Sequence, residues 1–428
     1  MGSEIGIRDR AIANRGTTER AKGFSAEAKT RRDKTGKREQ LWIDSEVNYW
    51  ADTKKAKKDR RRKMIRDLES IIFEYPDDIE AKAFLAVWMW QSAKEGLPIH
   101  SHGAVTALIE DVLDVEPMHP CHHFRIHLWD NEKPARALAS AARCGQGSPG
   151  IAHMWHMPGH IYSKLKRYHD SAWQQEASAR VDHANMMRDR VMPDEIHNFA
   201  HNNEWLTRNL DYAGRVRHAV TMAKNMIELP RLPRVKDDGT WTIATRSSHV
   251  YGRRHLHGLL ANYELWDEIL ALKDTHYLRP GISAADKAKH WRLVSSAYFN
   301  TGKINEGNTI LDLMGKLLTK QRESKTKAGD AAAAKAKTEK KKESDVRKAK
   351  SAAERNYNTA ITALERGIAE AKMHRAFQAG NKEEAKVNFA KAGSFRNDRK
   401  AVIQLRLGNT AEAIKLAEYA VKAGTCRR

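Results

Sequence analysis

The chain has 428 residues, a hydrophobic fraction of 41% and a formal net charge of +22. No stretch approaches the ~18 consecutive apolar residues that a membrane-spanning helix requires, and the charged N-terminus lacks the apolar core of a secretory signal. The three cysteines lie far apart and form no CxxC pair, which argues against a disulfide framework and a redox motif. We therefore expect a cytoplasmic protein with reduced thiols that does not associate with a membrane.

The excess positive charge lies mainly in two segments, residues 1–67 and a stretch from about Lys320 to Lys350. Runs of this kind are usually solvated helix surface or tail. Nucleic-acid binding needs a basic patch that displaces counterions from phosphates. Since the middle of the chain is closer to charge balance, we do not expect nucleic acid as a partner.

Residues 1–67 predict a basic N-terminal arm that is helical and partly disordered. From residue 68 the pattern predicts a helical array that continues to residue 318. Its first buried helix is expected to begin at residues 75–78, with Pro76 in the first turn, and to contain the apolar run of residues 83–90.

A local signature recurs along the chain, in which an aromatic residue or Leu is followed by Gly or another turn residue and then by a new helix. Each copy predicts a helix hairpin, which cannot bury its apolar stripe without neighbours. The copies are residues 210–214, 263–266, 298–302, 377–380 and 405–408, with a related copy that lacks Gly at 162–168. The signature resembles the tetratricopeptide repeat (TPR), whose units have ~34 residues. The resemblance implies an all-α fold, a TPR-like α-solenoid of stacked helix hairpins.

Two segments complete the predicted organisation. Residues 319–352 form a charged, low-complexity insertion of Ala, Lys and Glu, which we expect to extend the neighbouring helices as a charged helical spur, with a disordered insertion as the alternative. Residues 353–428 predict C-terminal TPR-like hairpins, in which Asn381 and Glu384 have the spacing of a capping box.

Histidine is concentrated in the centre of the chain, where 13 of the 20 residues of this type lie between His100 and His201. His123 with His127 and His197 with His201 have the i, i+4 spacing of one helix face, and a further group surrounds Pro158, which we expect to open a helix. Neutral imidazoles so spaced can chelate zinc, with carboxylates completing the shell. The candidate ligands are His119, His123, His127, His153, His156, His160, His197 and His201, and the nearby carboxylates are Asp130, Asp182, Asp194 and Glu195.

If the three histidine segments belong to adjacent hairpins, their side chains converge on a single pocket. The alternative, which the sequence favours, is a structural network in which the histidines pack against tryptophans and find hydrogen-bond partners. The tryptophans available for it are Trp129, Trp155, Trp173 and Trp205. No HExxH, P-loop, GxGxxG or GxSxG motif accompanies the histidines.

The same segments carry a more specific resemblance. HPCHHFRIHLWD, HMWHMPGHIY and HNFAHNNEWL are similar to the motifs HP…H…IH, HMPxHIY and HNxxxL of a group of bacterial TPR-like proteins, some of which are joined to a thioredoxin-like domain. The resemblance covers roughly residues 70–275 and implies an α-solenoid without a settled chemistry. Because this chain has no CxxC, it gives no support to disulfide exchange.

These observations favour a binding protein over an enzyme. The first expectation is a scaffold for a protein or peptide partner, because stacked hairpins form a concave surface. The second is a metal-binding or metal-dependent hydrolytic site built from the central histidines. No organic cofactor is predicted, zinc or another transition metal is the candidate ion, and the oligomeric state is left open.

Overall fold

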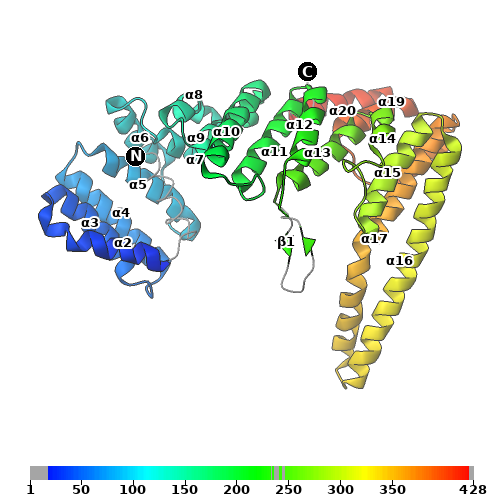
Figure 1. Ribbon diagram of the computed structural model, residues 1–428, viewed down its shortest axis with the longest axis horizontal. Coiled ribbons are helices and arrows are strands. Elements are labelled where there is room, and N and C mark those ends of the chain that lie inside the picture. The colour runs from blue at the N-terminus through cyan, green and yellow to red at the C-terminus, as the bar shows by residue number, and fades with distance from the viewer. Residues whose placement is uncertain (1–17, 233, 236–240, 243–245, 424–428) are drawn as a thin grey trace. The chain divides into compact units, whose positions relative to one another are not determined.

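A computed structural model describes residues 18–232, 234–235, 241–242 and 246–423. In these residues the chain is all-α, as predicted: α-helices α2 to α20 are joined by three short 3-10 helices and one pair of two-residue strands (Figure 1). None of these helices is both long and apolar enough to cross a bilayer.

The chain folds into two compact units, which divide between Asn209 and Leu210. The short segment Pro230–Leu232 also belongs to unit 1. Unit 1 comprises α2 (Thr18–Thr30), η1 (Arg32–Lys34), α3 (Lys37–Ala51), α4 (Lys57–Glu74), α5 (Ile79–Ser92), η2 (Ala93–Glu95), α6 (His102–Val115), α7 (His122–Trp129), η3 (Pro134–Ala137), α8 (Leu138–Gly147), α9 (Ala152–Lys164), α10 (Tyr168–Asp189) and most of α11 (His197–Tyr212). Each of α3 to α6 packs on the next helix, and α9 packs on both α8 and α10.

Unit 2 begins in the last turn of α11. It comprises α12 (Val216–Glu228), β1 (Arg234–Val235), β2 (Trp241–Thr242), α13 (Ser248–Asn262), α14 (Trp266–Leu272), α15 (Ala284–Asn300), α16 (Ile304–Thr338), α17 (Glu343–Gln378), α18 (Lys382–Lys391), α19 (Asn397–Leu407) and α20 (Thr410–Ala423). The boundaries predicted from composition, at residues 67, 318 and 352, fall inside α4, α16 and α17.

Two helix starts differ from the prediction. α5 begins at Ile79, because the carboxylate of Asp78 accepts a hydrogen bond from the backbone N–H of Ala81 at 3.0 Å and caps the helix there. Pro76 therefore lies in the preceding turn. Pro158 does not open a helix but lies inside α9, where it removes one backbone hydrogen bond. The helix continues through it, because packing of the buried residues on both sides of Pro158 supplies most of a helix's stability.

The recurring signature corresponds to one turn conformation. In each of its copies one residue has a positive φ: Lys166, Gly214, Glu264, Gly302, Gly380 and Gly408, with φ between 52° and 89°. In each copy the N–H of the next residue also donates to the carbonyl five positions before it, as Asn409 does to Gln404 at 2.9 Å. This is the Schellman end of a helix. The copies without Gly adopt the left-handed conformation with Lys166 and Glu264 in its place.

Replacing Gly380 by alanine is expected to lower the free energy of unfolding by about 1 kcal/mol, because its φ of +70° disfavours any side chain. No atom lies within 4 Å of the added Cβ, so the change isolates backbone strain. Gly258→Ala is the matched control: Gly258 lies inside α13, its new Cβ also meets nothing within 4 Å, and alanine there should stabilise the helix by roughly 0.5–1 kcal/mol. Urea unfolding measures both changes, and shifts of equal sign would contradict this account of the turn.

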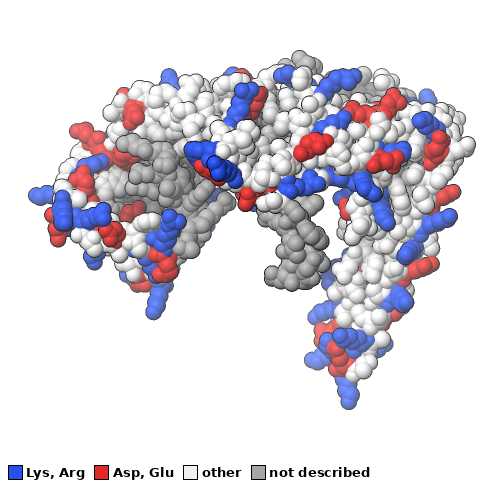
Figure 2. Space-filling view, in the orientation of Figure 1, with Lys and Arg blue, Asp and Glu red and all other residues white. Residues whose placement is uncertain are grey.

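The charged insertion is helical, as predicted. α16 and α17 pack along each other as a hairpin that projects from the rest of unit 2 (Figure 1). Figure 2 shows both signs of charge on this hairpin, and opposite charges meet across it, as in the ion pair of Lys350 with Asp330 at 2.7 Å. Half of the capping box is present, since Asn381 accepts a hydrogen bond from the N–H of Glu384 at 3.0 Å. The reciprocal bond is not formed, because the N–H of Asn381 donates to the carbonyl of Ala376 at 2.9 Å.

Cys121 and Cys144 are buried free thiols, and burial raises the pKa of both. They therefore remain protonated and unreactive, as expected for structural cysteines. Cys426 lies outside the described residues.

Candidate metal centre

Six of the eight candidate histidines form two neighbouring groups of three, both within unit 1. Trio A consists of His156, His160 and His201, and trio B of His123, His127 and His153. In each trio one ring nitrogen per residue lies within 4.8 Å of those of the other two. The three histidine segments of the sequence therefore meet through α7, α9 and α11, and they form two groups where a single pocket was expected.

The other two candidates lie outside the trios. Nδ1 of His119 accepts a hydrogen bond from the backbone N–H of Cys121 at 3.0 Å, and its Nε2 lies 3.3 Å from the carboxylate of Glu80. His119 therefore stabilises the turn before α7. His197 stacks against His201 with ring centroids 5.7 Å apart, at the edge of trio A.

A glutamine determines which nitrogen of His156 carries the proton. The amide nitrogen of Gln175 donates to the backbone carbonyl of His156 at 3.1 Å, so the amide oxygen must face the ring of His156, where it lies 2.6 Å from Nδ1. Nδ1–H is then the donor, and Nε2 keeps its lone pair. Burial lowers the pKa of His156 well below its ordinary value, so the ring is neutral at neutral pH.

A carboxylate has the same effect on His160. Nδ1 of His160 lies 3.5 Å from Asp130, which also forms an ion pair with Lys164 at 2.8 Å. Burial would raise the pKa of Asp130, but the hydrogen bonds from His160 and Lys164 lower it overall, and the group stays ionised. Nδ1 of His160 therefore carries a proton that faces Asp130. Outer partners of this kind orient the histidine ligands of metal ions.

As a result, Nε2 of His156 and Nε2 of His160 face each other at the centre of trio A. They are 2.9 Å apart, which is a hydrogen-bond distance, so either a proton on Nε2 of His160 or a cation shared by both nitrogens would bridge them. Two nitrogens bound to one tetrahedral zinc ion lie roughly 3.3 Å apart, close to the separation found here.

The surroundings of trio A leave one side open. Trp205 stacks on His160 with ring centroids 4.2 Å apart, and the guanidinium of Arg208 lies 3.7 Å from the centroid of Trp205. His156 is buried, whereas the side chains of His160 and His201 are 20% and 32% exposed. Trio A can therefore be reached from solvent at the end formed by His160 and His201.

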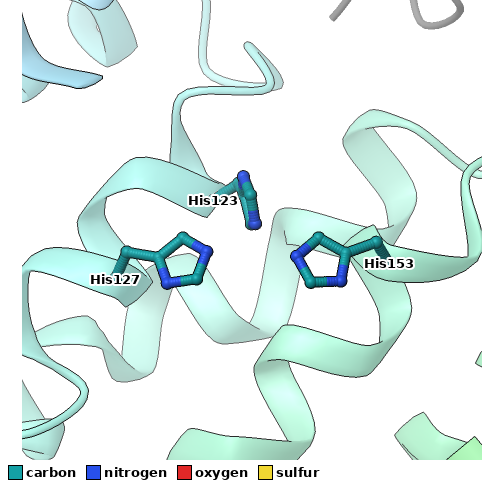
Figure 3. Close-up of side chains that lie close together, drawn as sticks. All are labelled: His123, His127 and His153. Carbon is teal, nitrogen blue, oxygen red and sulfur yellow. The ribbon is translucent and has the colours of Figure 1, made fainter. Parts of the chain in front are cut away.

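Trio B lies one turn further toward the start of α9. The rings of His127 and His153 lie 4.5 Å and 4.9 Å from that of His123, and all three face a common point (Figure 3). Trp90 stacks on His127 at 4.3 Å. Burial lowers the pKa of His127 to about 3 and that of His153 to about 4, so these rings are also neutral.

Of the four carboxylates near the histidines in sequence, only Asp130 contacts a trio. Asp182 accepts hydrogen bonds from Asn198 and Asn202, and burial raises its pKa to about 6. The other two cap backbone N–H groups: Asp194 accepts from Leu232, and Glu195 from Met192. The tryptophan packing expected from the sequence is present at the trios only for Trp205.

Gln175 is the functional residue that the sequence did not indicate. It lies 19 positions after His156, and no motif marks it. The signal that points to it is Gly159 of HMPGHIY, because a Cβ at that position would overlap the side-chain amide of Gln175. A glycine inside a helix can mark a close approach by another group.

No protein-family model matches the chain, and no curated protein matches it either.

Proposed function

We propose that this protein binds a divalent transition-metal ion, zinc first among the candidates, at trio A. The observation that carries the proposal is the approach of Nε2 of His156 and Nε2 of His160 to 2.9 Å, with the outer nitrogens held by Gln175 and Asp130. His201 supplies the third ligand.

The ligand type selects the class of metal. Neutral imidazoles suit zinc, copper and nickel, whereas calcium and magnesium require oxygen ligands. Three protein ligands leave a fourth position for water, which is the pattern of catalytic zinc sites. Hydrolysis by a metal-bound water is therefore the reaction class that the open, partly exposed side of trio A supports.

A second candidate function is the helical scaffold for a protein or peptide partner. Apolar side chains are exposed on the hairpin of α19 and α20 in unit 2, among them Leu405, Ile414 and Tyr419. Exposed apolar patches support partner binding. This function needs no metal, so metal content distinguishes it from the first.

Elemental analysis of protein purified without a histidine tag and equilibrated with zinc tests the proposal. We expect about one tightly bound equivalent in the wild type and none in the double variant His156→Ala, His160→Ala, because the remaining imidazole binds too weakly alone. His276→Ala, which changes an exposed histidine of unit 2 paired with Glu228, should keep the metal. Wild-type protein that is folded by circular dichroism and still holds no zinc would refute metal binding at trio A and leave the scaffold.

A further inference from the structure

We propose that trio B is a second, separate metal site, and that it takes a monovalent d10 cation, Cu(I), beside the divalent ion of trio A. The inference adds to the metal binding proposed above but depends on different residues. It rests on an unpartnered buried histidine, on the spacing of the two trios along α9 and on the absence of a carboxylate from trio B.

The first observation is His123. This side chain is only 4% exposed, and both of its ring nitrogens are buried without a hydrogen-bond partner. A neutral imidazole has one donor and one acceptor, and buried polar atoms nearly always find partners. The ring instead faces His127 and His153 (Figure 3). A cation between the three rings would satisfy the acceptor nitrogen of each.

The second observation separates the two ions. His153 and His156 lie on successive turns of α9, with ring centroids 5.9 Å apart and nearly parallel planes. An imidazole binds a metal ion along a lone pair in the plane of its ring, and nearly parallel rings direct these lone pairs along parallel lines instead of toward one point. His153 and His156 also fall in different sets of mutually close ring nitrogens, so the two trios define two positions for an ion. His153 therefore belongs to one site and His156 to the next.

The third observation concerns charge. Asp130 lies one turn after His127 in the chain, but its carboxylate is engaged by His160 and Lys164 of the trio A side. Trio B itself holds three neutral imidazoles, and the ammonium of Lys94 lies over Trp90, which stacks on His127. Among the described residues no carboxylate contacts trio B, and Asp130 acts on His127 only through space while it pairs with His160 and Lys164.

This environment favours a low charge. The cost of burying an ion grows with the square of its charge, so a monovalent ion costs roughly a quarter as much as a divalent one. A divalent ion in trio A would also repel a second divalent ion more than a monovalent one. Copper is among the metals that imidazole ligands suit, and Cu(I) is its monovalent form.

The test uses the full chain under anaerobic conditions. Protein loaded with one equivalent of zinc is titrated with Cu(I) against a colorimetric Cu(I) chelator, while a zinc indicator reports release. We expect one further equivalent of Cu(I) to bind without displacing zinc. The variant His127→Ala should weaken Cu(I) binding at least about tenfold and leave zinc in place. His153→Gln, which keeps a polar side chain, should have the same effect. His160→Ala should lose zinc and keep Cu(I).

The outcomes separate the two proposals. Cu(I) binding that is unchanged in His127→Ala and His153→Gln, Cu(I) that only displaces zinc, or a second equivalent of zinc in trio B would each overturn this inference. Cu(I) binding that depends on His127, in a protein that holds no zinc, would support the Cu(I) site at trio B and refute the zinc site at trio A.

Discussion

Zinc is expected to raise the free energy of unfolding of unit 1 by about 4 kcal/mol when free zinc is a thousand times its dissociation constant. The ligands of trio A come from α9 and α11, and their outer partners Gln175 and Asp130 come from α10 and the end of α7. An ion that binds only this arrangement stabilises the folded state against every opening that separates these helices.

Hydrogen exchange measured by mass spectrometry, with and without zinc, locates the effect. The backbone amides of α9 and α11 should exchange more slowly with zinc, whereas those of α15 and α17 in unit 2 serve as an internal reference and should not change. His160→Ala should abolish the difference. Equal protection of both units, or protection that survives in His160→Ala, would mean that zinc acts elsewhere.

Replacing Glu370 by leucine should lower the free energy of unfolding of unit 2 by about 3–5 kcal/mol. Glu370 is 2% exposed and lies on α17. It accepts hydrogen bonds from Nε of Arg292 on α15 and, at 2.8 Å, from Arg399 on α19. Without it the guanidinium groups of Arg292 and the buried Arg399 face each other, and only the carboxylate of Glu264, 3.9 Å from Arg399, remains to compensate their charge. This loss is more costly than that of an exposed pair.

The same helix provides a matched control for this change. Glu365 pairs with Arg322 at 2.7 Å, but both side chains are largely exposed. Glu365→Leu should therefore change the free energy of unfolding by less than about 1 kcal/mol. Urea denaturation of both variants measures the difference, and equal effects would show that burial of Glu370 does not determine its contribution.

The local structure of this protein could be predicted from its sequence. Helix hairpins, their turns and the helical spur depend on residues within a few positions of one another, such as Gly380 at a helix end or Asn381 and Glu384 at a helix start. Lys166 and Glu264 adopt the same turn without glycine, because the flanking helices and the hydrogen bond that closes the turn outweigh a modest backbone strain.

The candidate site was predictable only as a set of histidines. The i, i+4 spacings of His123 with His127 and of His197 with His201 suggested that each pair acts together, yet His153 joins the first pair, and His201 joins His156 and His160. Which rings meet depends on how α7, α9 and α11 pack, and such contacts between distant segments have no local pattern in the sequence.

The sequence by itself determined the all-α class, the repeated turn and the concentration of imidazoles in one region, because each follows from composition or short-range spacing. Only the tertiary structure decided that the histidines form two trios, that Gln175 and Asp130 orient trio A, and that His123 is left without a partner in trio B. The physical reason is that the position of a proton, or the lack of a hydrogen-bond partner, depends on neighbours that packing brings together. Gln175 lies 19 residues from His156 in the chain, and Asp130 lies 30 residues from His160.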